Sequence, residues 1–551
     1  MASTRPDGVD RLPPSPGAGR PAAARAPAAL AGLLATAVAL GLAELVAGLS
    51  RGTGSLVVAV GDAVVRAVPG SLERWAIATF GTADKPVLLT GILVLSAAFG
   101  AALGLLGRRR RLLADAGLVA FAVLGVAAAS ADARTQTAAA VAAGVVGAAG
   151  GIATLHVLLR TAPRTDASPA RPEGVAGRTP GDPALAADGV ASPPAVLGRR
   201  SFLALAAAAA GVAAIGAGAG RWLASSRVVE QVRAAIRIPR PAQPAPAVDP
   251  RAALEVPGLS PLFTPNEDFY RIDTALTVPR VDPGDWSLEV RGMVDRPFRL
   301  TYDELLTMPH IETDITLSCV SNQVGGDLVG NARWQGVPLH VLLERAGVRP
   351  GATQLLGRSV DGFTAGFPTE LALALPQALV AVAMNGEPLP VEHGFPARIV
   401  VPGLYGYVSA TKWLSAIELT TFEAEQGFWI PRGWAREGPV KTQSRIDVPR
   451  RSARVPAGRT VVAGVAWAPT RAIERVEVRV DDGPWAEAQL AAAIGPDTWR
   501  QWRYDWDATG GSHTLAVRAT DGTGEVQTAE RAPVAPDGAT GHHTIEVTVE
   551  G

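Results

Sequence analysis

The amino-acid sequence predicts an α-helical transmembrane region, then an α+β domain, then an all-β sandwich. Three observations support this order. Long apolar stretches are confined to residues 29–223, strand-like and helix-like runs alternate over residues 257–445, and strand-like runs alone follow over residues 446–551. At 551 residues, with 48% hydrophobic and 19% charged residues, the chain is long enough for three or four units and too apolar for wholesale disorder.

Charge and cysteine content exclude several classes of function. The 51 basic residues balance the 51 acidic residues, so no global field favours nucleic acid as a partner. Cys319 is the single cysteine of the sequence. It excludes an intramolecular disulfide, a CxxC redox pair, a cysteine-rich zinc site and a cysteine-ligated iron–sulfur cluster.

Five stretches each have about the 20 apolar residues needed to cross a bilayer. They are Ala29–Leu49, Pro86–Leu106, Leu112–Ala131, Thr137–Leu159 and Phe202–Gly220. The first four form a membrane region over 29–159, after an N-terminus at 1–28 that is predicted to be disordered. Ser55–Gly70 is interrupted by Asp62 and Arg66, so we expect it to be interfacial or re-entrant. Glu44 within the first span either marks a proton or quinone contact or snorkels to the end of the span.

Basic residues between the spans predict the orientation. Arg108–Arg111 lies between the second and third spans, and short basic loops face the cytoplasm. The N-terminus then lies inside, together with the linker over 160–198, which is rich in Pro, Ala and Gly and predicted to be disordered. Everything after Gly220 lies outside. The chain is therefore predicted to be a multi-pass cell-membrane protein whose folded domains are extracytoplasmic.

The segment 199–223 has two interpretations. Arg199-Arg200, followed by Phe202, resembles a twin-arginine signal anchor, and the alternative is a fifth transmembrane helix with an ordinary positive flank. A Pro-rich stalk is predicted to follow over 224–256. His156 is the only histidine within a span, so we do not expect a membrane haem, which needs two axial histidines.

The remaining residues predict the two folded domains. Over 257–445, strands such as Trp286–Arg291 and Arg398–Val401 alternate with helices such as Tyr302–Leu306 and Pro338–Ala346. After 446 the predicted strands are spaced as in a small β-sandwich, with Asp482-Gly483 as a turn. They are Val461–Ala466, Ile473–Val480, Trp499–Trp506, His513–Ala519 and His543–Val549.

Cys319 is the first candidate for chemistry. A lone cysteine is more often a small buried hydrophobic residue than a ligand, and that alternative stays open. However, Cys319 precedes a loop over 324–334 that is rich in glycine and polar groups. A soft thiolate suits a transition metal, and one thiolate without clustered histidines or carboxylates cannot build a protein-only zinc site. Most ligands of a metal bound here must therefore come from a cofactor.

Several long motifs resemble the sulfite oxidase family of molybdenum enzymes, in its bacterial, membrane-anchored branch. In chain order they are Ser318–Asn322, Gly330–Leu339, Met384–Arg398, Val401–Gly406 and Thr411–Leu414. The resemblance covers Pro257–Gly551. It includes a tail at 446–551 that is similar to the immunoglobulin-like dimerisation domain of molybdenum-cofactor oxidoreductases, which is compatible with a homodimer.

The resemblance implies a molybdenum–molybdopterin cofactor with one pyranopterin dithiolene, and Cys319 as the protein ligand of the metal and a catalytic residue. It implies cofactor binding by Asn266, Phe269, Tyr270, Arg271, Ser359, His393, Arg398, Ser409, Thr411 and Lys412. Arg333, Arg358 and Asp361 are candidate substrate contacts. Taken singly, Arg398 is equally well a surface ion-pair partner and His393 a turn histidine.

Departures from the family pattern concern the substrate. Sulfite-oxidising members place two arginines where this chain has Gln323 and Val324, a tyrosine where it has Val382, and Asn-His where it has Ile272-Asp273. A dianion such as sulfite needs cations to capture and orient it. We therefore expect oxygen-atom transfer on another small substrate, with an S-oxide or N-oxide reductase or a sulfite dehydrogenase as the alternatives.

Two further expectations concern partners. Because the sequence shows no second redox centre, electrons are expected to leave to an external carrier. The alternative from another class is a cofactor-less binding module on a membrane anchor, which uses its β-sandwich for adhesion.

Overall fold

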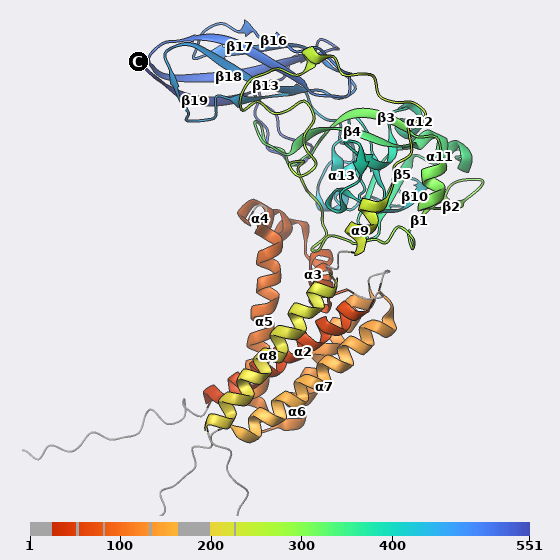
Figure 1. Ribbon diagram of the computed structural model, residues 1–551, viewed down its shortest axis with the longest axis vertical. Helices are drawn as coiled ribbons and strands as arrows, with labels where there is room; N and C mark the ends of the chain where they lie inside the picture. The colour runs from red at the N-terminus through yellow and green to blue at the C-terminus, as the bar shows by residue number, and fades with distance from the viewer. Residues whose placement is uncertain (1–24, 51–53, 81–82, 132–134, 163–198, 225–227) are drawn as a thin grey trace, which may run out of the picture. The chain divides into compact units, whose positions relative to one another are not determined.

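The computed structural model describes residues 25–50, 54–80, 83–131, 135–162, 199–224 and 228–551 (Figure 1). Most of the N-terminus and linker predicted to be disordered lies outside the described residues. The chain divides into two compact units, a helical unit of 1–67 and 76–226 and a second unit of 68–75 and 227–551.

Seven helices precede residue 225 in the described part of the chain. They are α2 (Arg25–Leu49), α3 (Leu56–Ala67), α4 (Gly70–Phe80), α5 (Asp84–Gly107), α6 (Arg111–Ser130), α7 (Thr137–Thr161) and α8 (Arg199–Ala224). Five of them, α2, α5, α6, α7 and α8, are long and apolar enough to cross a membrane. The five predicted apolar helices are confirmed, whereas their crossing of a membrane stays a prediction. The Ser55–Gly70 segment forms α3 and the start of α4.

Small residues let α2 pack closely against three other helices, α5, α7 and α8. A Cβ on Gly104 would lie 2.0 Å from the Ala28 carbonyl oxygen, and one on Gly48 would lie 2.3 Å from the Gly220 carbonyl oxygen. Close backbone approach of this kind supplies packing energy between helices, and it matters most for helices in a membrane, where the hydrophobic effect does not drive their association.

The polar residues of the predicted spans find partners inside the unit. Asp115 of α6 lies 2.9 Å from His156 Nε2 of α7. Glu44 is 8% exposed and accepts a hydrogen bond of 2.5 Å from the Ser55 hydroxyl. Pairing of this kind offsets the cost of polar groups in an apolar surrounding.

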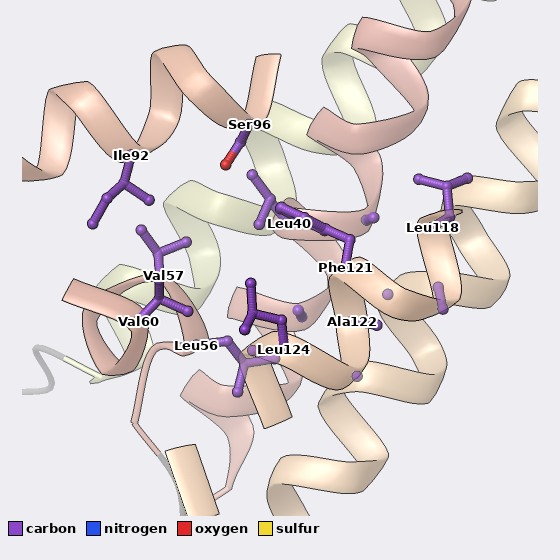
Figure 2. A pocket seen from close by; sticks show the side chains of 16 residues that line it. Leu40, Leu56, Val57, Val60, Ile92, Ser96, Leu118, Phe121, Ala122 and Leu124 are labelled. Carbon is purple, nitrogen blue, oxygen red and sulfur yellow. The ribbon is translucent and has the colours of Figure 1, made fainter. Parts of the chain in front are cut away.

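A cavity of about 70 Å³ lies among α2, α3, α5, α6 and α7 (Figure 2). Its lining is apolar, with Leu40, Leu56, Phe121 and Leu124 prominent, and Ser96 is the one polar side chain among the 16 lining residues. The cavity therefore suits apolar atoms and offers no charged group.

The second unit begins with an α+β part. Its helices are α9 (Val228–Ala235), α10 (Tyr302–Thr307), α11 (Leu339–Ala346), α12 (Thr369–Ala374) and α13 (Gly406–Ser409). Its strands are β1 (Ser287–Gly292), β2 (Phe298–Thr301), β3 (Ile311–Ser318), β4 (Val329–Pro338), β5 (Gln354–Ser359), β6 (Thr364–Pro368), β7 (Leu379–Met384), β8 (Glu387–Pro388), β9 (Arg398–Val400) and β10 (Leu414–Thr420). The predicted α+β class is confirmed.

These strands form two sheets. One has the order β2-β1-β10-β5-β6, and the other has β3-β4-β7-β8 with β9 paired to β7. Every residue of β7 is buried, which is the pattern of a central strand covered on both faces. The second sheet carries the candidate site, because β3 leads to Cys319 and β9 begins at Arg398.

An all-β part follows (blue in Figure 1). Its strands are β11 (Gln443–Val448), β12 (Arg454–Pro456), β13 (Gly458–Trp467), β14 (Ile473–Val480), β15 (Ala486–Glu487), β16 (Gln489–Leu490), β17 (Arg500–Ala508), β18 (Gly511–Asp521) and β19 (His543–Glu550). They form the sheets β11-β13-β17-β16 and β12-β19-β18-β14-β15 around a core that includes Trp502 and Ile545. The five predicted strands are confirmed, and the immunoglobulin-like character stays a prediction.

The stalk expected over 224–256 is not a free spacer along its length. The Ala242 amide donates to the His310 carbonyl at 2.8 Å, and the Glu312 amide donates to the Gln243 carbonyl at 2.8 Å. Gln335 Nε2 also donates to the Pro239 carbonyl at 2.7 Å. Residues around Gln243 lie along the edge of β3 at its Ile311 end, a position that tolerates prolines because their missing N–H faces away from the sheet.

Close packing at α5 gives the first prediction. Gly104→Ala should lower the thermal stability of the detergent-solubilised protein, since overpacking costs roughly 1–3 kcal/mol. Gly91→Ala is the matched control, because a Cβ on Gly91 of the same helix meets nothing within 4 Å. Equal melting temperatures of the two variants in a helix-specific circular-dichroism melt would contradict the close α2–α5 contact.

Candidate functional site

Cys319 lies directly after β3, at the start of the loop that returns to β4. It is 8% exposed, and its thiol accepts a hydrogen bond of 3.4 Å from the Ser321 amide. Burial raises the pKa of the Cys319 thiol. Without a cation bound to its sulfur, this cysteine is therefore held as a neutral thiol.

The loop after Cys319 is fixed by its own polar groups. The Cys319 amide donates to the Leu328 carbonyl at 2.9 Å, and the Leu328 amide donates to the Asn322 side-chain oxygen at 2.9 Å. These two bonds close the loop at its base, so the backbone of Cys319 has a defined position.

The all-β part holds the tip of the same loop. Arg445 of β11 donates to the Gly326 carbonyl at 2.7 Å. Gly325 has φ +78, and a Cβ there would lie 2.2 Å from the His543 ring of β19. A side chain at Gly325 would therefore displace the ring, so glycine is required here for space as well as for its backbone conformation.

The stem of β3 is held from the same side. The Trp499 amide donates to the Thr316 hydroxyl at 2.7 Å, and the Thr316 amide donates to the Asp497 carbonyl at 2.9 Å. Strand, loop and cysteine are thus positioned by contacts to both parts of the second unit.

The structure brings together the motifs predicted to bind the pterin. His393 Nε2 lies 2.9 Å from the Asn266 carbonyl oxygen, and the Phe269 ring packs edge-on against the His393 ring with centroids 5.6 Å apart. Phe269 also stacks on Tyr270 at 5.2 Å. Burial lowers the pKa of His393 to about 4, so its imidazole is neutral at ordinary pH.

Arg398 is a buried cation without an anion beside it. It is 5% exposed and donates to the His393 carbonyl at 3.1 Å, and no carboxylate in the described part of the chain pairs with it. Its Nε has no hydrogen-bond partner. The guanidinium lies 5.0 Å from the centre of the Trp334 ring, and burial lowers the pKa of Arg398 to about 10.

Lys412 adds a second buried cation, which is partly compensated. Its Nζ donates to Asp273 at 2.8 Å and to the Glu392 carbonyl at 3.1 Å. Arg271 shares the same Asp273 carboxylate at 2.9 Å. Burial lowers the pKa of Lys412 to about 8 against the opposing effect of Asp273.

The three hydroxyl groups predicted to bind the cofactor differ in whether they already form hydrogen bonds within the protein. Thr411 Oγ1 is buried and has no partner. Ser409 Oγ donates to the Tyr405 carbonyl at 3.1 Å within α13, and Ser359 Oγ accepts from the Asp361 amide at 3.3 Å. Of these hydroxyls, those of Thr411 and Ser359 donate to no group in the described part of the chain, so both are free to donate to a bound anion.

The candidate substrate contacts are already engaged in other interactions. Arg333 forms two hydrogen bonds to Asp314, at 2.7 and 2.9 Å. Arg358 pairs with Glu418 at 2.8 Å and Glu425 at 2.5 Å. The carboxylate of Asp361 accepts from the Phe363 amide at 3.0 Å in a local turn. Both arginines therefore lie in neutralised pairs, and their role as substrate contacts stays a prediction.

The cations of the site fit the anionic end of a molybdopterin. Arg398 and Lys412 are buried and Arg271 is exposed. Together they carry three positive charges, and Asp273 carries one negative charge, so the net charge of the four side chains is two positive. A phosphate monoester carries close to two negative charges at neutral pH. The unpaired Arg398 Nε and Thr411 hydroxyl are donors of the kind such a phosphate needs.

Sequence reasoning missed two features of this site. Asp273 is noted only as a departure from the family pattern, although its acidic side chain two residues after Arg271 signalled an ion-pair partner. The support from Arg445 and His543 has no local signal, because both residues lie more than a hundred positions from Cys319.

Comparisons with known proteins agree with this geometry. The family described as "Oxidoreductase molybdopterin binding domain" matches residues 275–429. The uncharacterized oxidoreductase YuiH of Bacillus subtilis (strain 168) is 38% identical over 157 residues, which cover 28% of this chain and 76% of that protein. Sulfite oxidase of Arabidopsis thaliana is 30% identical over 303 residues, covering 46% and 75%.

Mitochondrial sulfite oxidase of Rattus norvegicus is 32% identical over 271 residues, which cover 41% of this chain. The chain spans about half the length of that relative, 49%.

The uncompensated charge gives the second prediction. Arg398→Met should leave the melting temperature of the cofactor-free protein unchanged or raise it, because a buried cation without a partner is replaced by an apolar side chain. The affinity of the same variant for the molybdenum cofactor should fall about ten- to a hundredfold, because one charge-assisted contact is lost. Calorimetry and metal analysis check the two effects.

Arg445→Met is the matched control. Arg445 is also buried, but it pairs with Asp447 at 2.7 Å. Its loss should destabilise the cofactor-free protein by roughly 3–5 kcal/mol. A comparable loss in Arg398→Met would mean that the Arg398 charge is satisfied within the protein.

Proposed function

Because the chain belongs to the sulfite oxidase family of molybdopterin-dependent oxidoreductases, we propose that it transfers an oxygen atom to or from a small uncharged substrate at a molybdenum centre held by Cys319. The observations that carry this proposal are the buried Cys319 thiol and the buried Arg398 guanidinium, whose Nε has no hydrogen-bond partner. The cofactor is molybdenum–molybdopterin, and when bound it supplies the two-electron oxygen-atom chemistry.

The residues of this chain have separate tasks in the proposal. Cys319 gives up its thiol proton and offers a thiolate to the metal. Arg398, Lys412 and Thr411 hold the phosphate end of the cofactor. The aromatic rings of Phe269 and Trp334 exclude water from the buried guanidinium, which strengthens each charged contact there.

Neutralised cations support an uncharged substrate over sulfite. Gln323 and Val324 stand where sulfite-oxidising relatives place arginines, and Val382 is fully buried within β7. Arg333 and Arg358 are the remaining candidates to supply charge, and each is paired with carboxylates. An S-oxide or N-oxide needs a hydrogen-bond donor rather than a net positive charge, so reduction of such a substrate is the favoured direction.

The proposal extends to location and partners. We infer a multi-pass cell-membrane protein with the catalytic part on the extracytoplasmic side, supported by the five apolar helices and by the basic Arg108–Arg111 segment. Electrons would be exchanged with an external carrier. A homodimer remains a prediction from the resemblance of the tail, and family membership leaves the cofactor-less adhesion hypothesis without support.

The third prediction tests the substrate class. With reduced benzyl viologen as electron donor, the purified protein should reduce dimethyl sulfoxide or trimethylamine N-oxide. With ferricyanide as acceptor, it should oxidise sulfite with a kcat/KM at least about tenfold lower than its kcat/KM for the S-oxide or N-oxide. A tenfold difference is the effect of one missing charge-assisted contact. Steady-state kinetics measure both. Sulfite as the better substrate would overturn the uncharged-substrate argument.

Cys319→Ser is the control for that assay. The fold should persist, and turnover of every substrate should be abolished, because an alkoxide is a harder ligand than a thiolate. Full activity of the variant with molybdenum bound would show that Cys319 is not the ligand.

The fourth prediction concerns topology. A reporter fused after Leu223 should be active only on the extracytoplasmic side, and one fused within 161–198 only in the cytoplasm. Replacing both Arg199 and Arg200 by lysine preserves the charge, so loss of export in that variant would identify a twin-arginine signal and normal export an ordinary positive flank. Cytoplasmic activity of the Leu223 fusion in the unaltered chain would refute the proposed orientation.

A further inference from the structure

Helix α9 (Val228–Ala235) follows the last apolar helix, α8, along the chain and lies in the segment that the sequence predicts to be a stalk. It is packed against the α+β part instead. Val229 of the helix and Ile236 directly after it lie against the hydrophobic core of the second unit. The helix is therefore part of the folded domain, and its polar side chains have fixed neighbours there.

Arg233, in the last turn of α9, reaches the hairpin formed by β7 and β8. Its Nη1 donates to the Pro388 carbonyl at 2.9 Å and lies 3.7 Å from the Glu387 carboxylate. Its Nε donates to Glu230 of the same helix at 3.0 Å. The Arg233 side chain is 20% exposed, so most of its surface is shielded from water and these contacts give the guanidinium a defined position.

The same carboxylate of Glu387 contacts Asn266, one of the residues predicted to bind the cofactor. Asn266 Nδ2 donates to Glu387 Oε1 at 2.5 Å, while Arg233 lies beside the other carboxylate oxygen, Oε2. Asn266 Oδ1 accepts from Asn385 Nδ2 at 2.9 Å, and the Asn266 carbonyl oxygen lies 2.9 Å from His393 Nε2. A chain of contacts thus runs from α9 to His393.

Glu387 is the link in this chain that needs support. Its side chain is 50% exposed, and a half-exposed glutamate without a partner moves among several rotamers. The contact with Arg233 restricts this motion and keeps the carboxylate beside Asn266. The position of Asn266 therefore depends in part on a residue of α9.

We propose that Arg233 is a positioning residue of the cofactor site, which acts through Glu387 to hold Asn266 in place for the molybdopterin. This inference rests on the proposed function. It assigns to α9 a task in cofactor retention, in addition to its place in the chain after α8. Groups that orient the ligands of a bound metal typically contribute about ten- to a hundredfold to its affinity, and Arg233 would act in the same way for a cofactor ligand.

Arg233→Met tests the proposal in the full-length, detergent-solubilised, molybdenum-loaded protein. We expect molybdenum to be lost about tenfold faster than from the unaltered protein, as measured by metal analysis after timed gel filtration. Arg233→Lys keeps a cation beside Glu387 and a donor for the Pro388 carbonyl, so it should restore most of the retention.

Arg518→Met is the matched control. The Arg518 side chain is 26% exposed and pairs with Glu477 at 2.9 Å on the sheet formed by β14 and β18. Its hydrogen bonds within the described ranges go to Glu477 and to no predicted cofactor-binding residue. Removing this guanidinium should leave the rate of molybdenum loss unchanged.

A double variant tests the route through Glu387. Glu387→Ala alone should speed molybdenum loss, because Asn266 loses an acceptor. Adding Arg233→Met to Glu387→Ala should then cause little further loss, since residues that act through one contact are not additive. A double variant whose effect equals the product of the two single effects would show that Arg233 does not act through Glu387.

Hydrogen–deuterium exchange of the cofactor-free protein gives a readout that does not depend on metal. Exchange over 264–271, where the Asp268 amide donates to the Pro265 carbonyl at 3.0 Å, should be faster in Arg233→Met. Exchange over 311–319, which includes β3 and Cys319, should not change. Equal acceleration in both segments would indicate general destabilisation and would overturn the positioning role.

Unchanged molybdenum retention in Arg233→Met, or equally fast loss in Arg518→Met, would also overturn the inference. The proposed function fails separately, if the unaltered protein holds no molybdenum. In that case the exchange experiment still decides whether α9 holds the segment around Asn266, so the two failures are distinguishable.

Discussion

A guanidinium without a neighbouring carboxylate, that of Arg398, lies in the core of the α+β part, and the residues around it are those that tolerate a positive charge. The face of Trp334 lies 5.0 Å away, His393 stays neutral with a pKa of about 4, and Asp273 is used by Lys412 and Arg271 instead. An isolated buried charge opposes folding. The α+β part therefore carries a cost that only an anion in this site removes, so cofactor binding and the stability of the fold are linked.

The other arginines of the site also differ in whether a carboxylate neutralises them. Among the arginines proposed to bind the cofactor, Arg398 has no carboxylate partner among the described residues, and Arg271 shares Asp273 with Lys412. Those at candidate substrate positions, Arg333 and Arg358, are each paired with carboxylates. This division separates the binding of an anionic cofactor from the binding of substrate.

Much of the fold is readable from local sequence. The five apolar helices and the strands of the all-β part follow from runs of residues whose period and length are sufficient evidence. The set Asn266, Phe269, His393 and Arg398 was identified through motifs, and the structure brings these residues together. The predictions that the structure does not bear out concern properties that depend on residues far apart in the sequence. Residues 238–256 look like a spacer because of their prolines, but residues 239–246 are held by hydrogen bonds to β3, to His310 just before it and to β4. The pairing of Arg358 with Glu418 and Glu425 depends on segments far apart in sequence.

The contacts between the cysteine loop and the all-β part limit which other β-sandwich could replace that part. Gly325 and His543 are complementary in shape, and Arg445 reaches across to the Gly326 carbonyl. Exchange of the all-β part for another sandwich would have to bring a histidine and an arginine to the same two places, or leave the cysteine loop without its support. The two parts of the second unit therefore depend on each other at this loop, although each has its own hydrophobic core.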